Sequence, residues 1–356
     1  MIQKQLCIVL VLLAVAASSS QSLAQAKRSA NASTKAPAAP SADKSAKLPA
    51  ETPQPSTTVA YWRFEGDGKT TPEPGTYMTD TADRTGVFSA RGSLATDSSG
   101  NGNILYTWNA NFTGHRYVDR VPADTIPQTG EPNTRSIRNS GIFPSTFTWS
   151  RESKPTGVDL ETIIPLAWTI EASINRSRSI DFSTFVCREG QGVATGAIFA
   201  NGKQITDIEA PSWAPLYFQT RPVEGNAHLT IQFTDMAGIT HRLVDPEPME
   251  VNTWYQVAAV SDGATLSLYK DSGAGYVLVN STSLAATLSA DTRLCYDAAG
   301  TTTPDDEQWG WSVGRGRKGF TRRPVDDHVE RWMGSIDEVR ISSEALPPSK
   351  FLFAPK

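Results

Sequence analysis

The stretch Trp332–Ser342 reads WMGSIDEVRIS and has the alternation of a β-strand. In a strand, successive side chains point to opposite faces, so Asp337 is expected to share a face with Val339 and Ile341, opposite Ile336, Glu338 and Arg340. A face that carries Val339 and Ile341 is expected to be buried. A buried carboxylate must be paired, hydrogen-bonded or bound to a metal ion, because its unpaired transfer from water costs several kcal/mol. The sequence therefore predicts a strand here and a partner for Asp337.

Similar short alternating runs recur along the chain between clusters of Gly, Asp, Asn and Pro, whereas long helical periodicity is absent. This pattern is typical of an all-β sandwich. The expected strands cover residues 59–65, 104–108, 168–175, 183–187, 228–233, 254–260, 265–270, 276–280, 311–313 and 335–341. The Ser261-Asp262-Gly263 sequence between two of them predicts a hairpin turn.

The run LAWTIEASI, residues 166–174, shows which faces are expected to be buried. Apolar side chains share one face, namely Leu166, Trp168, Ile170, Ala172 and Ile174. The opposite face carries Thr169, Glu171 and Ser173. Such a strand is expected to cover a core on one side only.

The N-terminal residues predict export. Lys4 precedes the twelve apolar residues 6–17, and small residues follow up to Ala26, which is typical of a signal peptide over residues 1–26. The apolar run is shorter than the roughly 20 residues that a membrane-spanning helix needs, and no later stretch approaches that length. We therefore expect a secreted, periplasmic or cell-envelope protein without a transmembrane segment after signal removal.

Composition divides the rest of the chain. Residues 27–57 are nearly all Ala, Ser, Pro, Thr and Lys, so they cannot bury enough apolar surface to offset the entropy of ordering and are expected to form a disordered linker. Residues 58–356 contain all nine tryptophans and predict one β domain with insertions. The net charge of this domain is −8, which argues against nucleic acid as a partner.

Two cysteines remain after signal removal, Cys187 and Cys295. In an oxidising compartment they are expected to form a disulfide. Two buried thiols are the alternative, because the sequence does not give the distance between them.

Five segments together resemble a known family. They are YWRFE (61–65), DSSGNGN (97–103), WTIEASI (168–174), WYQVAAVSDGATLSLYKDSG (254–273) and GSIDEVRISSEAL (334–346). In this order they resemble the laminin G-like branch of the concanavalin A-like lectin and glucanase jelly rolls. The resemblance implies a jelly-roll β-sandwich of two antiparallel sheets in which the first and last strands lie side by side. The 64 residues between Asn103 and Trp168 and the stretches 190–226 and 283–308 are longer than this family usually has, so any function private to this chain is to be sought there.

The resemblance also implies a partner for Asp337, since the carboxylate at this position commonly helps to hold a structural calcium ion. Glu65 and Asp97 are the expected companions, because calcium takes oxygen ligands. The alternative is a metal-free role, in which Asp337 pairs with an arginine such as Arg63 or caps turn amides.

Two further groups of residues are candidate ligand contacts. Arg315 and Arg317 begin a stretch with five cations in nine residues, which suits sulfated or uronic-acid glycans because guanidinium matches carboxylate and sulfate geometry. Trp213 and Trp309 lie outside the strand patterns and could stack on sugar rings. The alternatives are a solvated loop for the arginines and structural packing for the tryptophans.

Catalytic patterns are weak, so no catalytic residue is assigned. Glucanases of this fold carry Glu-x-Asp-x-x-Glu on one strand, and the nearest segment here, QITDIE at 204–209, lacks both glutamates at that spacing. We therefore expect an exported binding or adhesion module for a carbohydrate or extracellular glycoconjugate. A polysaccharide-cleaving enzyme on the same fold and a purely structural envelope protein are the alternatives.

Overall fold

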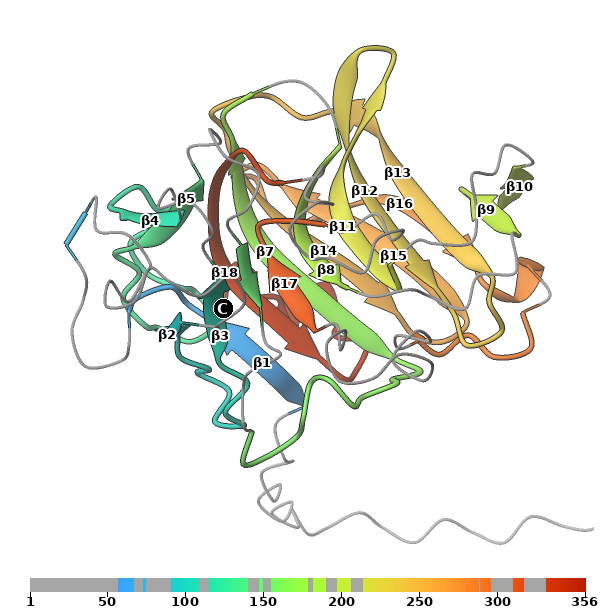
Figure 1. Cartoon of the computed structure of the whole chain (residues 1–356). Helices are drawn as coiled ribbons and strands as arrows, with labels where there is room; N and C mark the ends of the chain where they lie inside the picture. The colour runs from blue at the N-terminus through green and yellow to red at the C-terminus, as the bar shows by residue number, and fades with distance from the viewer. Residues whose placement is uncertain are drawn as a thin grey trace, which may run out of the picture. The chain divides into compact units, whose positions relative to one another are not determined.

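A computed structural model describes residues 57–66, 73–74, 91–108, 115–139, 147–149, 155–178, 182–189, 197–205, 214–287, 289–295, 310–316 and 331–356. Almost all regular structure in these ranges is strand (Figure 1). The same ranges contain two short 3-10 helices, η1 (Ala285–Thr287) and η3 (Pro348–Lys350). In this part of the chain, no helix has both the length and the apolar character needed to cross a membrane.

Among the described residues, the first sheet has eight strands in the order β16–β15–β14–β7–β18–β5–β4, with β1 also paired to β18. Every pair in it is antiparallel. The strands are β1 (Thr58–Trp62), β4 (His115–Val118), β5 (Ser136–Asn139), β7 (Trp168–Arg176), β14 (Trp254–Ser261), β15 (Thr265–Asp271), β16 (Val277–Ser283) and β18 (Gly334–Ser342).

The second sheet has ten strands in the part of the chain that the structure describes, in the order β10–β9–β13–β12–β11–β8–β17–β6–β3–β2. All of its pairs are antiparallel except the parallel pair β13–β9. The strands are β2 (Arg91–Ala95), β3 (Leu105–Trp108), β6 (Phe147–Trp149), β8 (Ser183–Arg188), β9 (Ile198–Ala200), β10 (Lys203–Ile205), β11 (Leu216–Val223), β12 (Asn226–Thr234), β13 (Thr240–Pro248) and β17 (Trp311–Val313).

The main core lies between the inner faces of the two sheets. Trp168 of β7 packs edge-on against Phe233 of β12, with ring centroids 5.3 Å apart. The same apolar cluster includes Ile174 from the first sheet and Phe218 from the second. Because one continuous core joins both sheets, the predicted all-β sandwich is confirmed.

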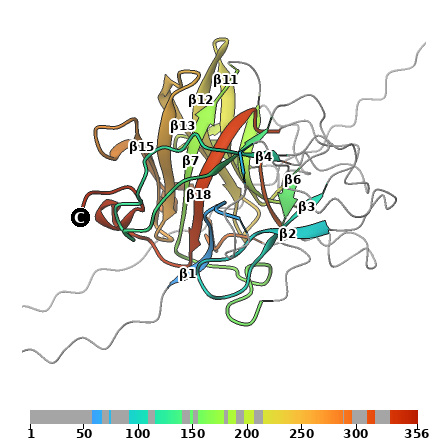
Figure 2. The same ribbon diagram turned by 90° about the vertical axis from the view of Figure 1, so that its left-hand side faces the viewer.

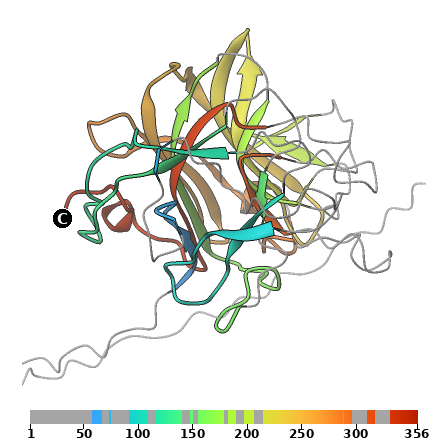
Figure 3. The same cartoon turned by 60° about the vertical axis from the view of Figure 1, so that its left-hand side comes forward.

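The first and last strands lie side by side, as the family resemblance implied. β1 pairs antiparallel with the C-terminal half of β18, so that Trp62 is opposite Val339. Figure 1 shows the two as neighbouring blue and red arrows, and Figures 2 and 3 show them from other directions. The start of the domain is therefore held by its end.

A β-bulge in β18 overturns the expected placement of Asp337. Ile336 pairs with Ile174 and Ile341 pairs with Ile170, but the register shifts between Asp337 and Arg340. Glu338 accommodates the extra residue with a left-handed φ of 48°. As a result Ile336, Val339 and Ile341 all belong to the core, whereas Asp337 faces outward beside Ser173. The expectation that Asp337 shares a face with Val339 is therefore wrong.

The outer face of β7 is also buried, contrary to expectation. Thr169, Glu171 and Ser173 are at most 1 % exposed. The C-terminal segment covers them, since Leu352 N donates to Glu171 Oε1 at 2.7 Å and Thr169 Oγ1 donates to Glu344 O at 2.7 Å. Leu166, expected in the core, precedes the strand and is 52 % exposed.

Each of the ten expected strands overlaps an observed one. The predicted turn is present too, since Asp262 Oδ1 accepts hydrogen bonds from Ala264 N and Thr265 N at 2.8 and 2.6 Å. Two long strands, β11 and β13, were not predicted. Pro222 in the first and Pro246 and Pro248 in the second obscure the strand pattern, because proline removes a donor from the ladder.

Gly334 supplies the first stability prediction. It begins β18 with φ 143°, and a Cβ at this position would lie 2.0 Å from the carbonyl oxygen of Asn175. We expect Gly334→Ala to lower the free energy of unfolding by about 2–4 kcal/mol, measured by urea denaturation, because backbone at the β18–β7 junction must shift.

Gly100→Ala is the matched control. Gly100 also has a positive φ, 83°, but no atom lies within 4 Å of a Cβ there. The cost is therefore the backbone strain alone, about 1 kcal/mol. Equal losses for the two variants would contradict the role assigned to Gly334.

Candidate functional site

The bulge in β18 presents two buried carboxylates to the start of the chain. Asp337 and Glu338 are both 0 % exposed. Glu338 accepts a hydrogen bond from the Tyr61 hydroxyl through Oε2 and one from Arg63 Nε at 3.2 Å through Oε1. Tyr61 lies on β1 and Arg63 follows it directly, so Glu338 attaches the first strand to the last.

Asp337 has different partners from those expected. Asn133 Nδ2 donates to its Oδ2 at 2.9 Å, and Glu338 N donates to its Oδ1 at 3.0 Å. Asn133 comes from the segment before β5. The predicted arginine partner, Arg63, binds Glu338 instead. Asp337 is therefore held by an amide and a backbone N–H rather than by a cation.

Of the two carboxyls in this cluster, Glu338 contacts the Arg63 guanidinium and Asp337 does not, and both pKa values are raised. Burial raises the pKa of Glu338 to about 7, although Arg63 opposes the shift. Burial, followed by the charge of Glu338, raises the pKa of Asp337 well above its usual range. Burial and Glu338 also raise the pKa of Tyr61. The site favours protonated carboxyls because desolvation disfavours the charged forms.

The carboxylates of Glu65 and Asp97, which were expected to bind calcium with Asp337, accept hydrogen bonds from N–H and O–H groups. Glu65 Oε1 accepts from Thr134 N and Arg135 N at 2.6 and 2.9 Å, and its Oε2 accepts from Thr134 Oγ1. Asp97 accepts hydrogen bonds at 2.9 Å from the backbone N–H groups of Tyr61, Ser99 and Asn103. Within the described ranges, no group of three His, Cys, Asp or Glu side chains could hold a metal ion. The residues as they stand do not fit the expected calcium site.

Of the four predicted ligand contacts, one is buried and three lie outside the described residues. Arg315 is fully buried and forms a two-point ion pair with the buried Glu189, so the expectation of a surface ligand residue is wrong. The Arg315 guanidinium binds Glu189 in the interior of the protein, where an unpaired charge would be costly. Arg317, Trp213 and Trp309 lie outside the described residues.

The expected disulfide is not formed in the structure. Cys187 and Cys295 are both buried, and no disulfide joins them in the part of the chain described. Cys187 lies on β8, whereas the backbone N–H of Cys295 donates to Thr234 O at the end of β12.

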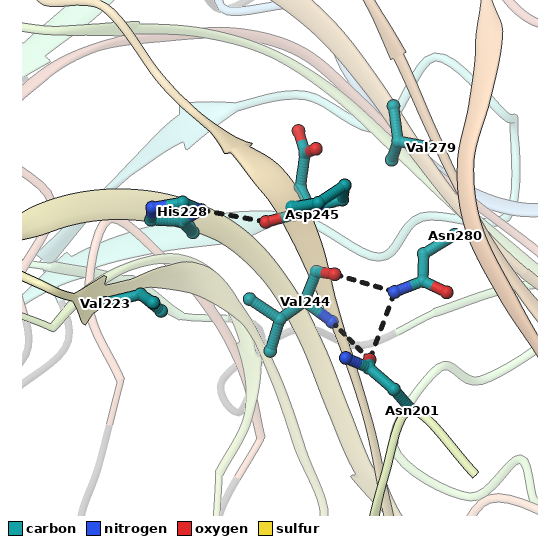
Figure 4. A pocket seen from close by; sticks show the side chains of 8 residues that line it. Asn201, Val223, His228, Val244, Asp245, Val279 and Asn280 are labelled. Carbon is teal, nitrogen blue, oxygen red and sulfur yellow. Dashed lines mark hydrogen bonds between the residues drawn. The ribbon is translucent and has the colours of Figure 1, made fainter.

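A pocket of about 310 Å³ opens where β13 of one sheet meets β16 of the other (Figure 4). Its walls combine four polar and four apolar residues, namely Asn201, His228, Asp245, Asn280, Val223, Val244, Pro246 and Val279. The volume is near the lower end of small-molecule sites. We call it the β13–β16 pocket.

Hydrogen bonds fix the polar groups of the β13–β16 pocket. Asn201 Oδ1 accepts from Val244 N and from Asn280 Nδ2, both at 3.1 Å, and Asn280 Nδ2 also donates to Val244 O at 2.7 Å (Figure 4). Both amides are thereby oriented against the backbone of β13. Asn201 occupies this place because Asn201 and Gly202 form the two-residue hairpin between β9 and β10, with positive φ at both positions.

A register shift between β12 and β13 places His228, Asp245 and Pro246 in the lining of the β13–β16 pocket. His228 pairs with Pro248 while Thr230 pairs with Val244, so Asp245 and Pro246 leave the ladder. His228 Nδ1 lies 2.8 Å from the carbonyl oxygen of Asp245, which can only accept, so Nδ1 carries a proton and donates it to this oxygen. The Asp245 carboxylate is buried against Lys270 and accepts from Glu247 N at 3.0 Å.

Sequence analysis missed this pocket because β13 was not predicted. The Asn201-Gly202 dipeptide was the available signal, since Asn-Gly between short strands predicts a tight hairpin. It falls within the stretch 190–226 that was singled out as longer than the family pattern. Nothing in the sequence placed Asn280 against that hairpin.

Comparisons with known proteins give distant likenesses. No protein-family model matches the chain, and no curated protein matches it. Domain 4 of AbnA, a GH43 extracellular arabinanase from Geobacillus stearothermophilus, in complex with arabinotriose, is 12 % identical with a TM-score of 0.43, over 85 % of this chain and 100 % of that one. A putative carbohydrate binding protein from Bacteroides ovatus is 16 % identical with a TM-score of 0.33, over 55 % of this chain and 43 % of that one. This chain therefore spans less than half of the Bacteroides ovatus chain, and neither likeness assigns a family or an activity.

The raised pKa values of Glu338 and Asp337 predict how stability depends on pH. Both carboxyls bind protons more tightly in the folded protein than in the unfolded chain, so their contribution to stability is full below about pH 4. The contribution of Glu338 is lost as the pH rises through about 7, and that of Asp337 is lost as the pH rises through its own raised pKa. Asp337→Asn removes one buried ionisable carboxyl. We therefore expect its free energy of unfolding, relative to that of the wild type, to rise by about 1–3 kcal/mol from pH 5 to pH 8, measured by urea unfolding.

Two controls accompany this measurement. Asp119→Asn changes an exposed carboxylate and should follow the wild type at both pH values. Melting with and without a chelator tests the calcium expectation, since a fall in Tm that requires Asp337 would support the ion. If the stability of Asp337→Asn relative to the wild type does not change with pH, the raised pKa assigned to Asp337 is contradicted.

Proposed function

We propose that the chain is an exported carbohydrate-binding β-sandwich whose ligand site is the β13–β16 pocket. One observation carries the proposal, namely that the amides of Asn201 and Asn280 are held rigidly beside an apolar wall. In the described part of the chain, Asn201 Nδ2 and Asn280 Oδ1 have no protein partner. One donor and one acceptor therefore remain for a ligand.

This combination of groups suits a sugar ring. A sugar offers hydroxyls along its edge, each able to donate and accept, and apolar C–H groups on its faces. The two amides and His228 Nε2 supply fixed partners for hydroxyls, and Val223, Val244 and Val279 supply an apolar surface. Preoriented partners lower the entropic cost of binding.

Binding is proposed in preference to cleavage. Glycoside hydrolases generally use two carboxyl groups on either side of the scissile bond. Among the described lining residues of the β13–β16 pocket, the one carboxylate is that of Asp245, and Lys270 and Glu247 N already hold it. Export, proposed from the N-terminal sequence, would bring the module to extracellular glycans.

A glycan array probed with residues 27–356 tests the proposal. We expect bound glycans on the array, and we expect Asn280→Ala to weaken the best of them by about tenfold, because at least one ligand hydrogen bond and the support of Asn201 are lost. Isothermal titration calorimetry with the best glycan measures the loss.

Ser281→Ala is the matched control. Ser281 is the exposed neighbour of Asn280 on β16, and neighbours in a strand point to opposite faces. It should leave affinity unchanged. An array without bound glycans, or equal affinities for both variants, would refute the proposed function.

A further inference from the structure

The apolar part of the β13–β16 pocket is made of small aliphatic side chains. Among the described residues that line it, Val223, Val244, Pro246 and Val279 are apolar, and none is Trp, Tyr or Phe. An aromatic ring offers a flat apolar surface, on which the face of a sugar ring can lie. Branched aliphatic side chains instead surround a compact group. The walls therefore fit a methyl group better than the flat face of a sugar ring.

The backbone of β13 fixes the orientation of both amides in the pocket. The N–H of Val244 can only donate, so the atom of Asn201 that lies 3.1 Å from it is the oxygen, Oδ1. The carbonyl oxygen of Val244 can only accept, so the atom of Asn280 that lies 2.7 Å from it is the nitrogen, Nδ2. Figure 4 shows both amides held against Val244 in this way.

These hydrogen bonds leave the two amides with opposite capacities. Asn280 Nδ2 uses both of its hydrogens, on Val244 O and on Asn201 Oδ1, so Asn280 can only accept further bonds through Oδ1. Asn201 Oδ1 already accepts two bonds, so Asn201 offers the donor Nδ2. A ligand group that accepts at one atom and donates at another would satisfy both amides.

The charges of the pocket favour a neutral ligand group. Among the described lining residues the one carboxylate is that of Asp245, whose side chain is 1 % exposed and pairs with Lys270. A ligand ammonium group would compete with Lys270 for this carboxylate, and leaving either buried ion unpaired is costly. A neutral substituent avoids that competition.

An acetamido group, the substituent of N-acetylated amino sugars, combines these properties. It carries a carbonyl acceptor, an N–H donor and a methyl group, and it has no charge. Its carbonyl oxygen would accept from Asn201 Nδ2, and its methyl group would contact the valine side chains. Asn280 Oδ1 would accept from the N–H or from a neighbouring ring hydroxyl. A hydroxyl in place of the acetamido group would lose the apolar contact.

We infer that the β13–β16 pocket selects glycans that carry an N-acetylated amino sugar, through Asn201 Nδ2, Asn280 Oδ1 and the valine walls. The inference rests on the proposed function, because it names the class of sugar that the same pocket would bind. The volume of about 310 Å³ suits recognition of one sugar unit and its substituent.

Matched glycans test the selection directly. Glycans that carry N-acetylglucosamine or N-acetylgalactosamine are compared with the same glycans that carry a hydroxyl or a free amine in place of the acetamido group. We expect residues 27–356 to bind the acetamido member at least about tenfold more tightly, measured by isothermal titration calorimetry. Equal affinities within the matched sets would overturn the inference.

Asn201→Asp tests the donor. The variant keeps the oxygen that accepts from Val244 N and Asn280 Nδ2, and it replaces Nδ2 by a second oxygen. Asn201 is exposed with a φ of 49°, a conformation that aspartate tolerates, so Tm should stay close to that of the wild type. We expect at least about a tenfold loss of affinity for the acetamido glycan and a smaller change for its hydroxyl counterpart. A variant that keeps the acetamido preference would overturn the role of Asn201.

Val223→Thr tests the methyl contact, and Val251→Thr is its matched control. The two valines are 37 % and 38 % exposed, but only Val223 is among the described lining residues of the pocket. We expect Val223→Thr to lose about threefold or more in affinity for the acetamido glycan, and Val251→Thr to bind as the wild type does. In saturation-transfer NMR the acetyl methyl protons should receive the strongest transfer. Equal affinities of the two variants would overturn the methyl contact.

The glycan array separates this inference from the proposed function. Binding to glycans without amino sugars, weakened by Asn280→Ala, overturns the acetamido selection and leaves the pocket proposal in place. Bound glycans that all carry an N-acetylated amino sugar, and that Asn201→Asp and Asn280→Ala both weaken, support the two together. An array without bound glycans refutes both.

Discussion

The β-bulge at Asp337 and Glu338 is the constraint on which the rest of the fold depends. β18 has two different neighbours along one edge, β5 before the bulge and β1 after it, with β7 along the other edge. The extra residue lets Ile336 and Val339 both reach the core and turns two carboxylates outward. Tyr61, Arg63 and Asn133 then meet those carboxylates, so the joint between the first and last strands is made of buried hydrogen bonds.

The two sheets differ in how their outer faces are used. On the eight-stranded sheet, buried carboxylates such as Glu171 and Asp337 accept hydrogen bonds from chain segments that cover the face. On the ten-stranded sheet, side chains of neighbouring strands bind one another, since Gln232 Oε1 accepts from Arg242 Nε and Gln219 Oε1 accepts from Thr184 Oγ1. Segments that cover the sheet therefore satisfy the polar groups of the first, whereas neighbouring strands satisfy these polar groups of the second. This separation follows from satisfying each buried polar group locally.

The β13–β16 pocket arises where β13 departs from a regular ladder. The register shift between His228 and Thr230 releases Asp245 and Pro246, and the β9–β10 hairpin and β16 close the remaining sides. Three segments far apart in the sequence thus contribute to one small site. Its amides are rigid because they bind the backbone of β13, which is the property that a weakly interacting ligand such as a sugar requires.

The sequence by itself determined the fold class, the ten strands with clear period-two patterns and the Asp262 turn, because alternation and turn chemistry are local properties. Only the tertiary structure decided which face Asp337 occupies, since a one-residue bulge reverses the alternation without changing the pattern. It also decided that Arg315 is buried with Glu189 and that Asn201 meets Asn280. Such pairs depend on contacts between residues distant in the chain, which no local pattern records.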